Sequence, residues 1–216
     1  MLFTRFKTLW WLKALGTTLF MWGFFSLYFR LQQVPAFSVT VMPLTWTDQA
    51  IPMQFWAWTP YLSLWLYTSL PPALQPNLRG LVYYAMCISL VCGVGLLCFY
   101  WWPTSVPPLI KPRHAQLQWL QGIDTAGNAC PSLHVASVLF SCLWLRHQLR
   151  QLDAGRLWQL LNAVWGVLIV YSTLATKQHV VWDVIAGGAL GGVGAWLSLS
   201  MVHRMPWLSG RGVLPA

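Results

Sequence analysis

The sequence contains no glutamate, and its only acidic residues are four aspartates. Charged side chains make up just 8% of the 216 residues, against roughly 25% in an ordinary soluble domain. Because 57% of the residues are apolar, the chain cannot cover a globule of this size with polar surface. A water-soluble monomer is therefore excluded, and the composition predicts an integral membrane protein.

Paired cysteines are also missing. The five cysteines form no Cys-x-x-Cys pair and lie mostly within apolar runs, which favours small buried side chains over a disulfide framework or a zinc site. The scarcity of carboxylates argues against a magnesium site. The net charge of +9 could suggest nucleic acid, but the cations are scattered singly between apolar runs. We therefore expect no metal, no other cofactor and no nucleic-acid partner.

Long apolar runs predict an all-α fold, a single membrane domain built as a six-transmembrane-helix bundle with short loops. The expected spans cover residues 14–31, 53–70, 80–102, 130–146, 157–176 and 180–202. The second span carries Pro60 and is expected to stop at Pro71 and Pro72, as a kinked or partly interfacial helix. The basic segment before the first span resembles a signal peptide, but no small-residue cleavage site follows it, so a retained anchor is expected.

The cations are distributed unevenly over the predicted loops. With a cytoplasmic N-terminus, nine of the 13 lysines and arginines face the cytoplasm, the arrangement that the positive-inside rule favours. Both termini are then cytoplasmic, and the starts of the fourth and sixth spans lie on the outer face. The expected location is a bacterial inner membrane, with these two span starts facing the periplasm.

Polar residues gather at those two span starts. Pro131 opens the fourth span and is followed by Ser132 and His134; proline is well placed to begin a helix, whose first-turn N–H groups can hold an anion. His179 and Asp183, at the start of the sixth span, are four residues apart and share one helical face, where the carboxylate can stabilise an imidazolium. Either motif alone is compatible with a polar anchor or a self-satisfied cap. Both on one membrane face favour a catalytic site.

These motifs resemble those of the type 2 phosphatidic acid phosphatases, the PAP2 superfamily. The family's second motif is Pro-Ser-Gly-His, and its third is Ser-Arg, five residues, His, three residues, Asp. The matching residues here are Pro131-Ser132-Leu133-His134, then Ser172-Thr173, His179 and Asp183. The resemblance covers roughly residues 80–200 and implies a membrane enzyme with six helices.

The sequence departs from the family pattern at the phosphate-binding cations. The first motif, Lys, six residues, Arg-Pro, is absent, Leu133 replaces the glycine and Thr173 replaces the arginine. The candidate substrate-binding residues are Ser132, Lys111, Arg113, Lys177 and Thr173. Loss of the arginine resembles the phosphotransferase branch, the sphingomyelin and inositol phosphorylceramide synthases.

The resemblance implies a mechanism for a lipid phosphate substrate in the bilayer. His179 attacks phosphorus, Asp183 orients it, and His134 gives a proton to the departing alcohol; water or a second alcohol then releases the phosphohistidine. The expectation is a metal-independent phosphatase or phosphotransferase. Two other readings stay open: a membrane haem protein with both histidines as axial ligands, and a transporter or scaffold that lost the chemistry.

Overall fold

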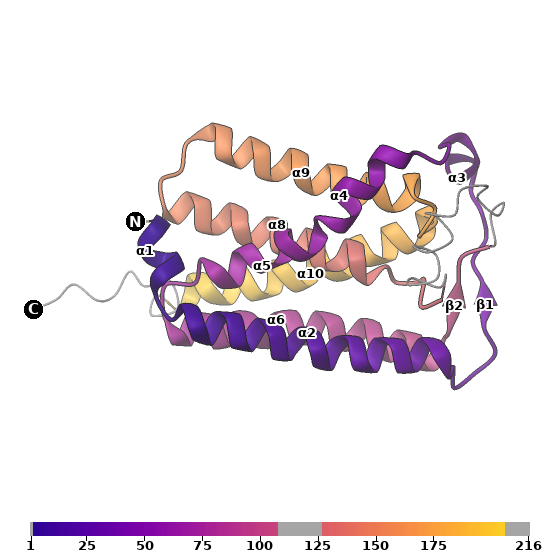
Figure 1. The fold of residues 1–216 in the computed structure, drawn as a ribbon, viewed down its shortest axis with the longest axis horizontal. Coiled ribbons are helices and arrows are strands. Elements are labelled where there is room, and N and C mark those ends of the chain that lie inside the picture. The colour runs from indigo at the N-terminus through magenta and orange to yellow at the C-terminus, as the bar shows by residue number, and fades with distance from the viewer. Residues whose placement is uncertain (1, 108–126, 206–216) are drawn as a thin grey trace, which may run out of the picture.

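The computed structural model describes residues 2–107 and 127–205 (Figure 1). The fold is all-α, as predicted, apart from one short strand pair. The helices are α1 (Leu2–Lys7), α2 (Trp10–Gln33), α3 (Trp46–Ala50), the 3-10 helix η1 (Phe55–Ala57), α4 (Trp58–Leu62), α5 (Leu64–Ala73), α6 (Leu78–Trp101), α8 (Leu133–Gln151), α9 (Arg156–Ala175) and α10 (Val181–Arg204). The strands β1 (Thr40–Val41) and β2 (Thr104–Ser105) pair in parallel, with Thr40 opposite Thr104.

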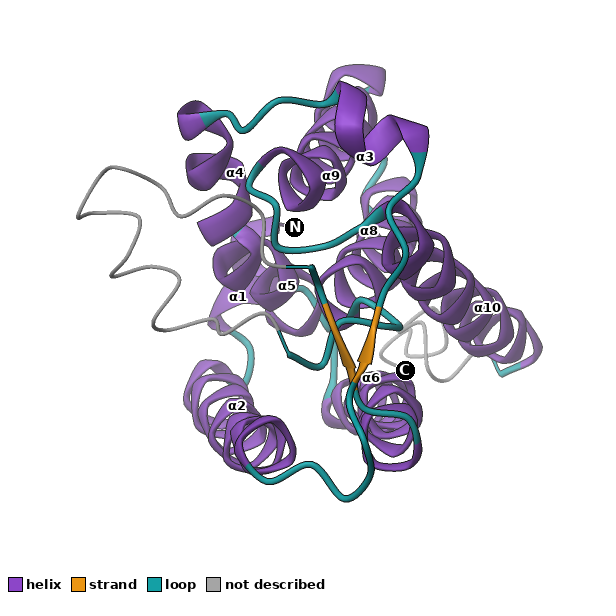
Figure 2. Cartoon of the chain, turned by 90° about the vertical axis from the view of Figure 1, so that its right-hand side faces the viewer, coloured by secondary structure: helices purple, strands orange, loops and turns teal. Residues whose placement is uncertain are grey.

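The long helices run along the long axis of the molecule (Figure 1). One end, called the α1 end below, holds α1, the end of α10 and the connection between α8 and α9. The other, called the strand end, holds β1, β2, α3 and the starts of α8 and α10 (Figures 1 and 2). The two motif segments therefore lie at the same end of the bundle, as predicted.

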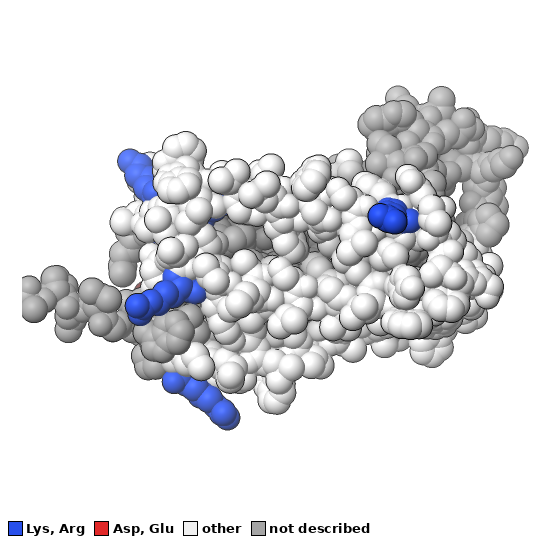
Figure 3. All heavy atoms as spheres, turned by 90° about the horizontal axis from the view of Figure 1, so that it is seen from below, with Lys and Arg blue, Asp and Glu red and all other residues white. Residues whose placement is uncertain are grey.

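Three helices of the described chain are long and apolar enough to cross a membrane. They are α6, α9 and residues Val181–Val202 of α10, and they correspond to the third, fifth and sixth expected spans. Large apolar side chains on these helices, such as Leu90, Val167 and Trp196, are exposed on the outside. Figure 3 shows one face of the molecule, on which lysine and arginine lie towards the two ends and the middle carries no charged side chain.

The predicted second span is divided, and its expected stop is wrong. Residues 53–70 form η1, α4 and the first part of α5, with Ser63 between the last two. Helix α5 continues through Pro71 and Pro72 to Ala73. Proline lacks an N–H donor and its ring crowds the carbonyl group four residues earlier, but its own carbonyl oxygen can still accept a hydrogen bond. That of Pro71 accepts one of 2.8 Å from Gln148 Nε2 of α8. This contact ties the last turn of α5 to the centre of the bundle.

Helix α8 is central, since it packs against α5, α6, α9 and α10. Its start and first turn lie against the backbone of α10. A Cβ atom added at Gly187 would collide with the carbonyl oxygen of Ser132, and one added at Gly191 with that of Ala136. Gly187 and Gly191 thus serve close helix packing, a role that small residues four positions apart commonly have in membrane helices.

Replacing Gly191 with alanine should destabilise the protein, because the added methyl group meets backbone and not a flexible side chain. We expect a loss of about 1–3 kcal/mol, the usual cost of overpacking. Gly188→Ala is the matched control, since nothing lies within 4 Å of its added Cβ, and it should leave stability unchanged or raise it by up to about 1 kcal/mol. Thermal unfolding in detergent measures both variants. Equal midpoints would contradict this packing.

Candidate active site

Ser132 joins the two motif segments. It is the N-cap of α8, and its hydroxyl oxygen accepts a hydrogen bond of 3.2 Å from the N–H of Val135. Its own N–H donates to the carbonyl oxygen of Asp183 at 3.0 Å. The residue is fully buried, and its hydroxyl is committed to the helix cap. Ser132 therefore fixes the start of α8 against the first turn of α10.

His179 and Asp183 contact each other, as predicted, but not across one helical face, because His179 lies before Val180, the N-cap of α10. Nδ1 of His179 lies 3.5 Å from Oδ2 of Asp183, whose side chain is fully buried. The same Oδ2 accepts the N–H of Val180 at 3.0 Å. Because Nδ1 faces the carboxylate, Nε2 is the ring nitrogen left to meet a substrate. Oδ1 of Asp183 has no hydrogen-bond partner within the described ranges, so the carboxylate can accept a further donor.

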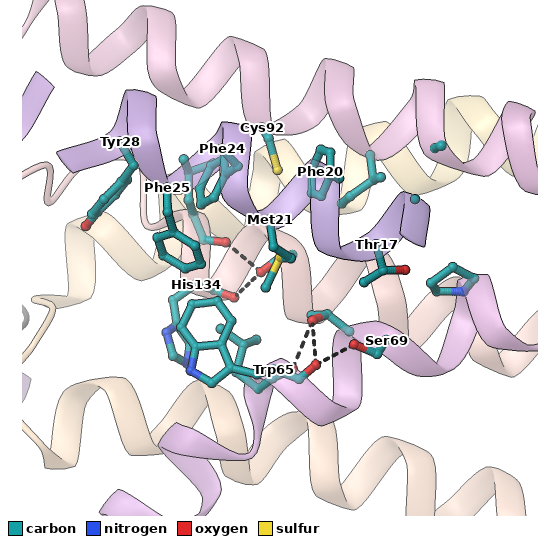
Figure 4. Close-up of a pocket in the computed structure, with 18 of the residues that line it drawn as sticks. Thr17, Phe20, Met21, Phe24, Phe25, Tyr28, Trp65, Ser69, Cys92 and His134 are labelled. Carbon is teal, nitrogen blue, oxygen red and sulfur yellow. Dashed lines mark hydrogen bonds between the residues drawn. The ribbon is translucent and has the colours of Figure 1, made fainter. Parts of the chain in front are cut away.

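His134 lies on an aromatic platform. Its ring stacks on Tyr61 of α4 with centroids 4.2 Å apart, and it meets Trp65 of α5 edge-on at 6.4 Å. Nε2 of His134 is buried and has no hydrogen-bond partner among the described residues, which leaves it available to exchange a proton. Figure 4 shows His134 and Trp65 side by side at the cavity.

His134 and His179 line the same cavity, which has a volume of about 570 Å³. The structure therefore brings together the three predicted catalytic residues: two imidazoles at one cavity, with a carboxylate behind one of them. Such a set can supply a nucleophile, a group that orients it and a second imidazole to move a proton.

Thr173 and Lys177 act inside the protein framework. The Thr173 hydroxyl donates to the carbonyl oxygen of Val170 at 2.8 Å, and the Thr173 carbonyl oxygen accepts the N–H of His179 at 3.2 Å. The Lys177 ammonium donates to the carbonyl oxygens of Asp48, at 2.7 Å, and Ile51. Burial lowers the pKa of Lys177, and the Asp48 carboxylate opposes that shift. The Thr173 carbonyl oxygen and the Lys177 ammonium thus hold the chain around His179.

The other two predicted cations, Lys111 and Arg113, lie outside the described residues. Among the residues that the structure describes, the one cation at the cavity is Lys13, near the α1 end and remote from the histidines. Within residues 2–107 and 127–205, no group of three or more His, Cys, Asp or Glu side chains is placed to hold a metal ion.

Asp48 is a site residue that sequence reasoning missed. Its Oδ1 accepts the N–H of Val181 at 2.9 Å, while its Oδ2 accepts the N–H and hydroxyl of Thr45 at 2.8 and 2.7 Å. This buried carboxylate clamps α3 to the first turn of α10, two residues from His179. The one sequence signal is the capping pattern of Thr45 and Asp48, which marks a helix start but not the distant contact.

Comparison with known proteins gives one match. The family model described as PAP2 superfamily matches residues 80–207. This range holds both histidines and Asp183, whereas α1 to α5, including Asp48, lie before it. No curated protein and no solved structure matches the chain.

Replacing Asp48 with asparagine should loosen the start of α10. Both carboxylate oxygens accept hydrogen bonds from N–H or hydroxyl donors, and an amide can present only one oxygen. We expect a loss of about 1–3 kcal/mol, the cost of leaving a buried donor unpaired. Thermal unfolding and amide hydrogen exchange at Val181 measure the effect.

The matched control is Asp153→Asn, because Asp153 is exposed and its φ of 50° suits asparagine. It should change neither the midpoint nor exchange at Val181. Unaltered exchange at Val181 in Asp48→Asn would remove Asp48 from this role.

Proposed function

The chain belongs to the PAP2 superfamily, and we propose that it is a membrane lipid phosphate phosphatase that works through a phosphohistidine on His179. The observation that supports this proposal is that His134 and His179 line one cavity, while Oδ2 of Asp183 lies 3.5 Å from Nδ1 of His179. Family membership supports phosphatase or phosphotransferase chemistry on lipid-like substrates. The cavity geometry supports the assignment of roles to residues.

The first half-reaction transfers the phosphoryl group to the protein. Nε2 of His179 attacks phosphorus and the bond from phosphorus to the alkoxy oxygen breaks, while His134 protonates that oxygen. Asp183 holds the Nδ1 proton and stabilises the positive charge on the ring. At 3.5 Å the two groups do not form a hydrogen bond in this structure, and we propose that they approach each other when substrate binds, as catalytic pairs commonly do.

The second half-reaction releases phosphate. His134, now neutral, takes a proton from water, the hydroxide oxygen bonds to phosphorus, and the bond from phosphorus to Nε2 breaks. The reaction balances with no metal-bound species. Lys111 and Arg113 remain our proposed partners for the phosphate oxygens. The hydrogen bonds of Ser132, Thr173 and Lys177 favour positioning roles for these three residues over direct contact with the phosphate.

We propose a bundle of six membrane segments: α2, α4 with α5, α6, α8, α9 and α10. Of the ten described lysines and arginines, only Arg30 and Lys177 lie at the strand end. The positive-inside rule then favours a cytoplasmic α1 end. The histidines accordingly face outward, towards the periplasm if the membrane is a bacterial inner membrane.

A phosphotransferase is the second candidate function. Thr173 stands where the phosphatase pattern has arginine, and its hydroxyl is bound to Val170, so this position supplies no cation to the phosphate. A phosphorylated His179 beside an apolar cavity could pass its phosphoryl group to an alcohol held there, because positioning can outweigh the higher concentration of water.

The test is phosphate release by sealed spheroplasts from an externally added, membrane-impermeant alkyl phosphate. We expect release without permeabilisation, loss of turnover by orders of magnitude in His179→Ala, and insensitivity to a metal chelator. Turnover only after permeabilisation would reverse the orientation. Absence of turnover with a panel of lipid phosphates would reject the phosphatase. A new alcohol phosphate, formed when alcohols are added, would favour the transferase.

The proton donor is tested in the same assay with His134→Ala. An alkyl phosphate has a poor leaving group and should lose far more turnover than an activated aryl phosphate, since only the alkoxide needs a proton. Equal losses on both substrates would exclude His134 as the acid.

A further inference from the structure

The cavity extends far beyond the two histidines. From His134 and His179 it continues between α2, α5, α6 and α8 to Lys13 and Leu81, near the α1 end. Figure 4 shows α2 side chains following one another along it, from Tyr28 past Phe24, Phe20 and Thr17. Catalysis on a phosphate group needs only the strand end of this space, so the remainder has another purpose.

The walls of the extension are apolar, and its far end is polar. Aromatic rings from α2 face the side chains of α5 and α6 along most of its length. At the far end, the Lys13 ammonium donates to the carbonyl oxygens of Arg5, Ala73 and Gln75 at 2.7, 2.8 and 2.9 Å. The ammonium group and the three carbonyl oxygens that it binds close the far end of the extension with polar atoms. An apolar ligand cannot pass this end.

The length of the extension can be measured along α2. Phe25 meets Trp65, which meets His134, so Phe25 marks the level of the catalytic histidine. From Phe25 to Lys13 the helix rises by about 18 Å, at about 1.5 Å per residue. An extended chain advances about 1.2 Å per bond, so about 15 carbons would fit.

We propose that this extension binds one hydrocarbon chain of the substrate, and we call it the chain seat. The bound chain lies parallel to the helices, and Lys13 limits its length. The proposal rests on the proposed function in taking the substrate to be a lipid phosphate. It narrows the substrate class to phosphates whose inserted chain is roughly 15 carbons long. The extension selects substrates by excluding longer chains. A hydrocarbon chain that moves from lipid to an equally apolar wall gains little free energy, so binding strength does not provide the selection.

Two glycines of α2 provide a matched pair of variants. Gly16 lines the extension one turn from Lys13, and nothing lies within 4 Å of a Cβ added there. Gly23 is also open within 4 Å, but it does not line the cavity. Leucine at position 16 should fill the far end and shorten the seat by about one turn, or about four carbons. Leucine at position 23 adds the same bulk outside it.

The first readout is the ratio of kcat/KM for hexadecyl phosphate to that for decyl phosphate. In Gly16→Leu we expect this ratio to fall by at least about fivefold, the lower bound for overpacking an apolar site. In Gly23→Leu it should stay within about twofold of the unsubstituted protein. Equal ratios in all three proteins would overturn the chain seat. Thermal unfolding confirms that both variants fold.

The second readout needs no turnover. A hexadecyl phosphate with a terminal diazirine should label residues 13–20 of α2 or 81–85 of α6, in the unsubstituted protein and in His179→Ala, and labelling there should be lost in Gly16→Leu. Labelling elsewhere would overturn the chain seat. Labelling at these residues without turnover of any lipid phosphate would reject the phosphatase but keep the seat.

Discussion

The close approach of α8 and α10 is the constraint on which the site depends. Gly187 and Gly191 let the α10 backbone meet the carbonyl oxygens of α8, and the Ser132 N–H then reaches the carbonyl oxygen of Asp183 at 3.0 Å. This single junction sets two helix starts side by side and so brings His134 and His179 to one cavity. A side chain at either glycine would separate the helices and, with them, the proposed nucleophile and proton donor.

The chain has few polar side chains. Most of those described near the helix starts form hydrogen bonds with backbone groups. Lys177 caps the end of α3, Asp48 holds the first turn of α10, and Lys13 closes the far end of the cavity by binding three carbonyl oxygens. In an apolar surrounding, each backbone N–H or carbonyl group without a hydrogen bond destabilises the folded protein. A charged side chain therefore stabilises the fold most where it hydrogen-bonds to several such groups. The imidazole of His134 is the exception, since its buried Nε2 has no hydrogen-bond partner among the described residues and keeps capacity for a substrate.

The sequence predicted what depends on local geometry. The four-residue spacing predicted the contact of His179 with Asp183 but not its geometry, since His179 lies before Val180, the N-cap of α10. The all-α fold and the family follow from composition and the two motifs. Contacts between distant segments could not be predicted, because one apolar helix face resembles another. Tyr61 beneath His134, Asp48 on Val181 and Gly16 at the cavity come from segments without a motif. The stop at Pro71 was wrong because α8 supports that turn from outside it.

The central claim is that the phosphoryl group passes through His179. The most direct measurement is to quench the enzyme with acid-free denaturant during turnover of a labelled lipid phosphate and locate the label by mass spectrometry. We predict a phosphoryl group on the His179 ring, acid-labile and base-stable, with none in His179→Ala and accumulation in Asp183→Asn below that of the unsubstituted protein. Label on any other residue, or turnover retained in His179→Ala, would contradict the account.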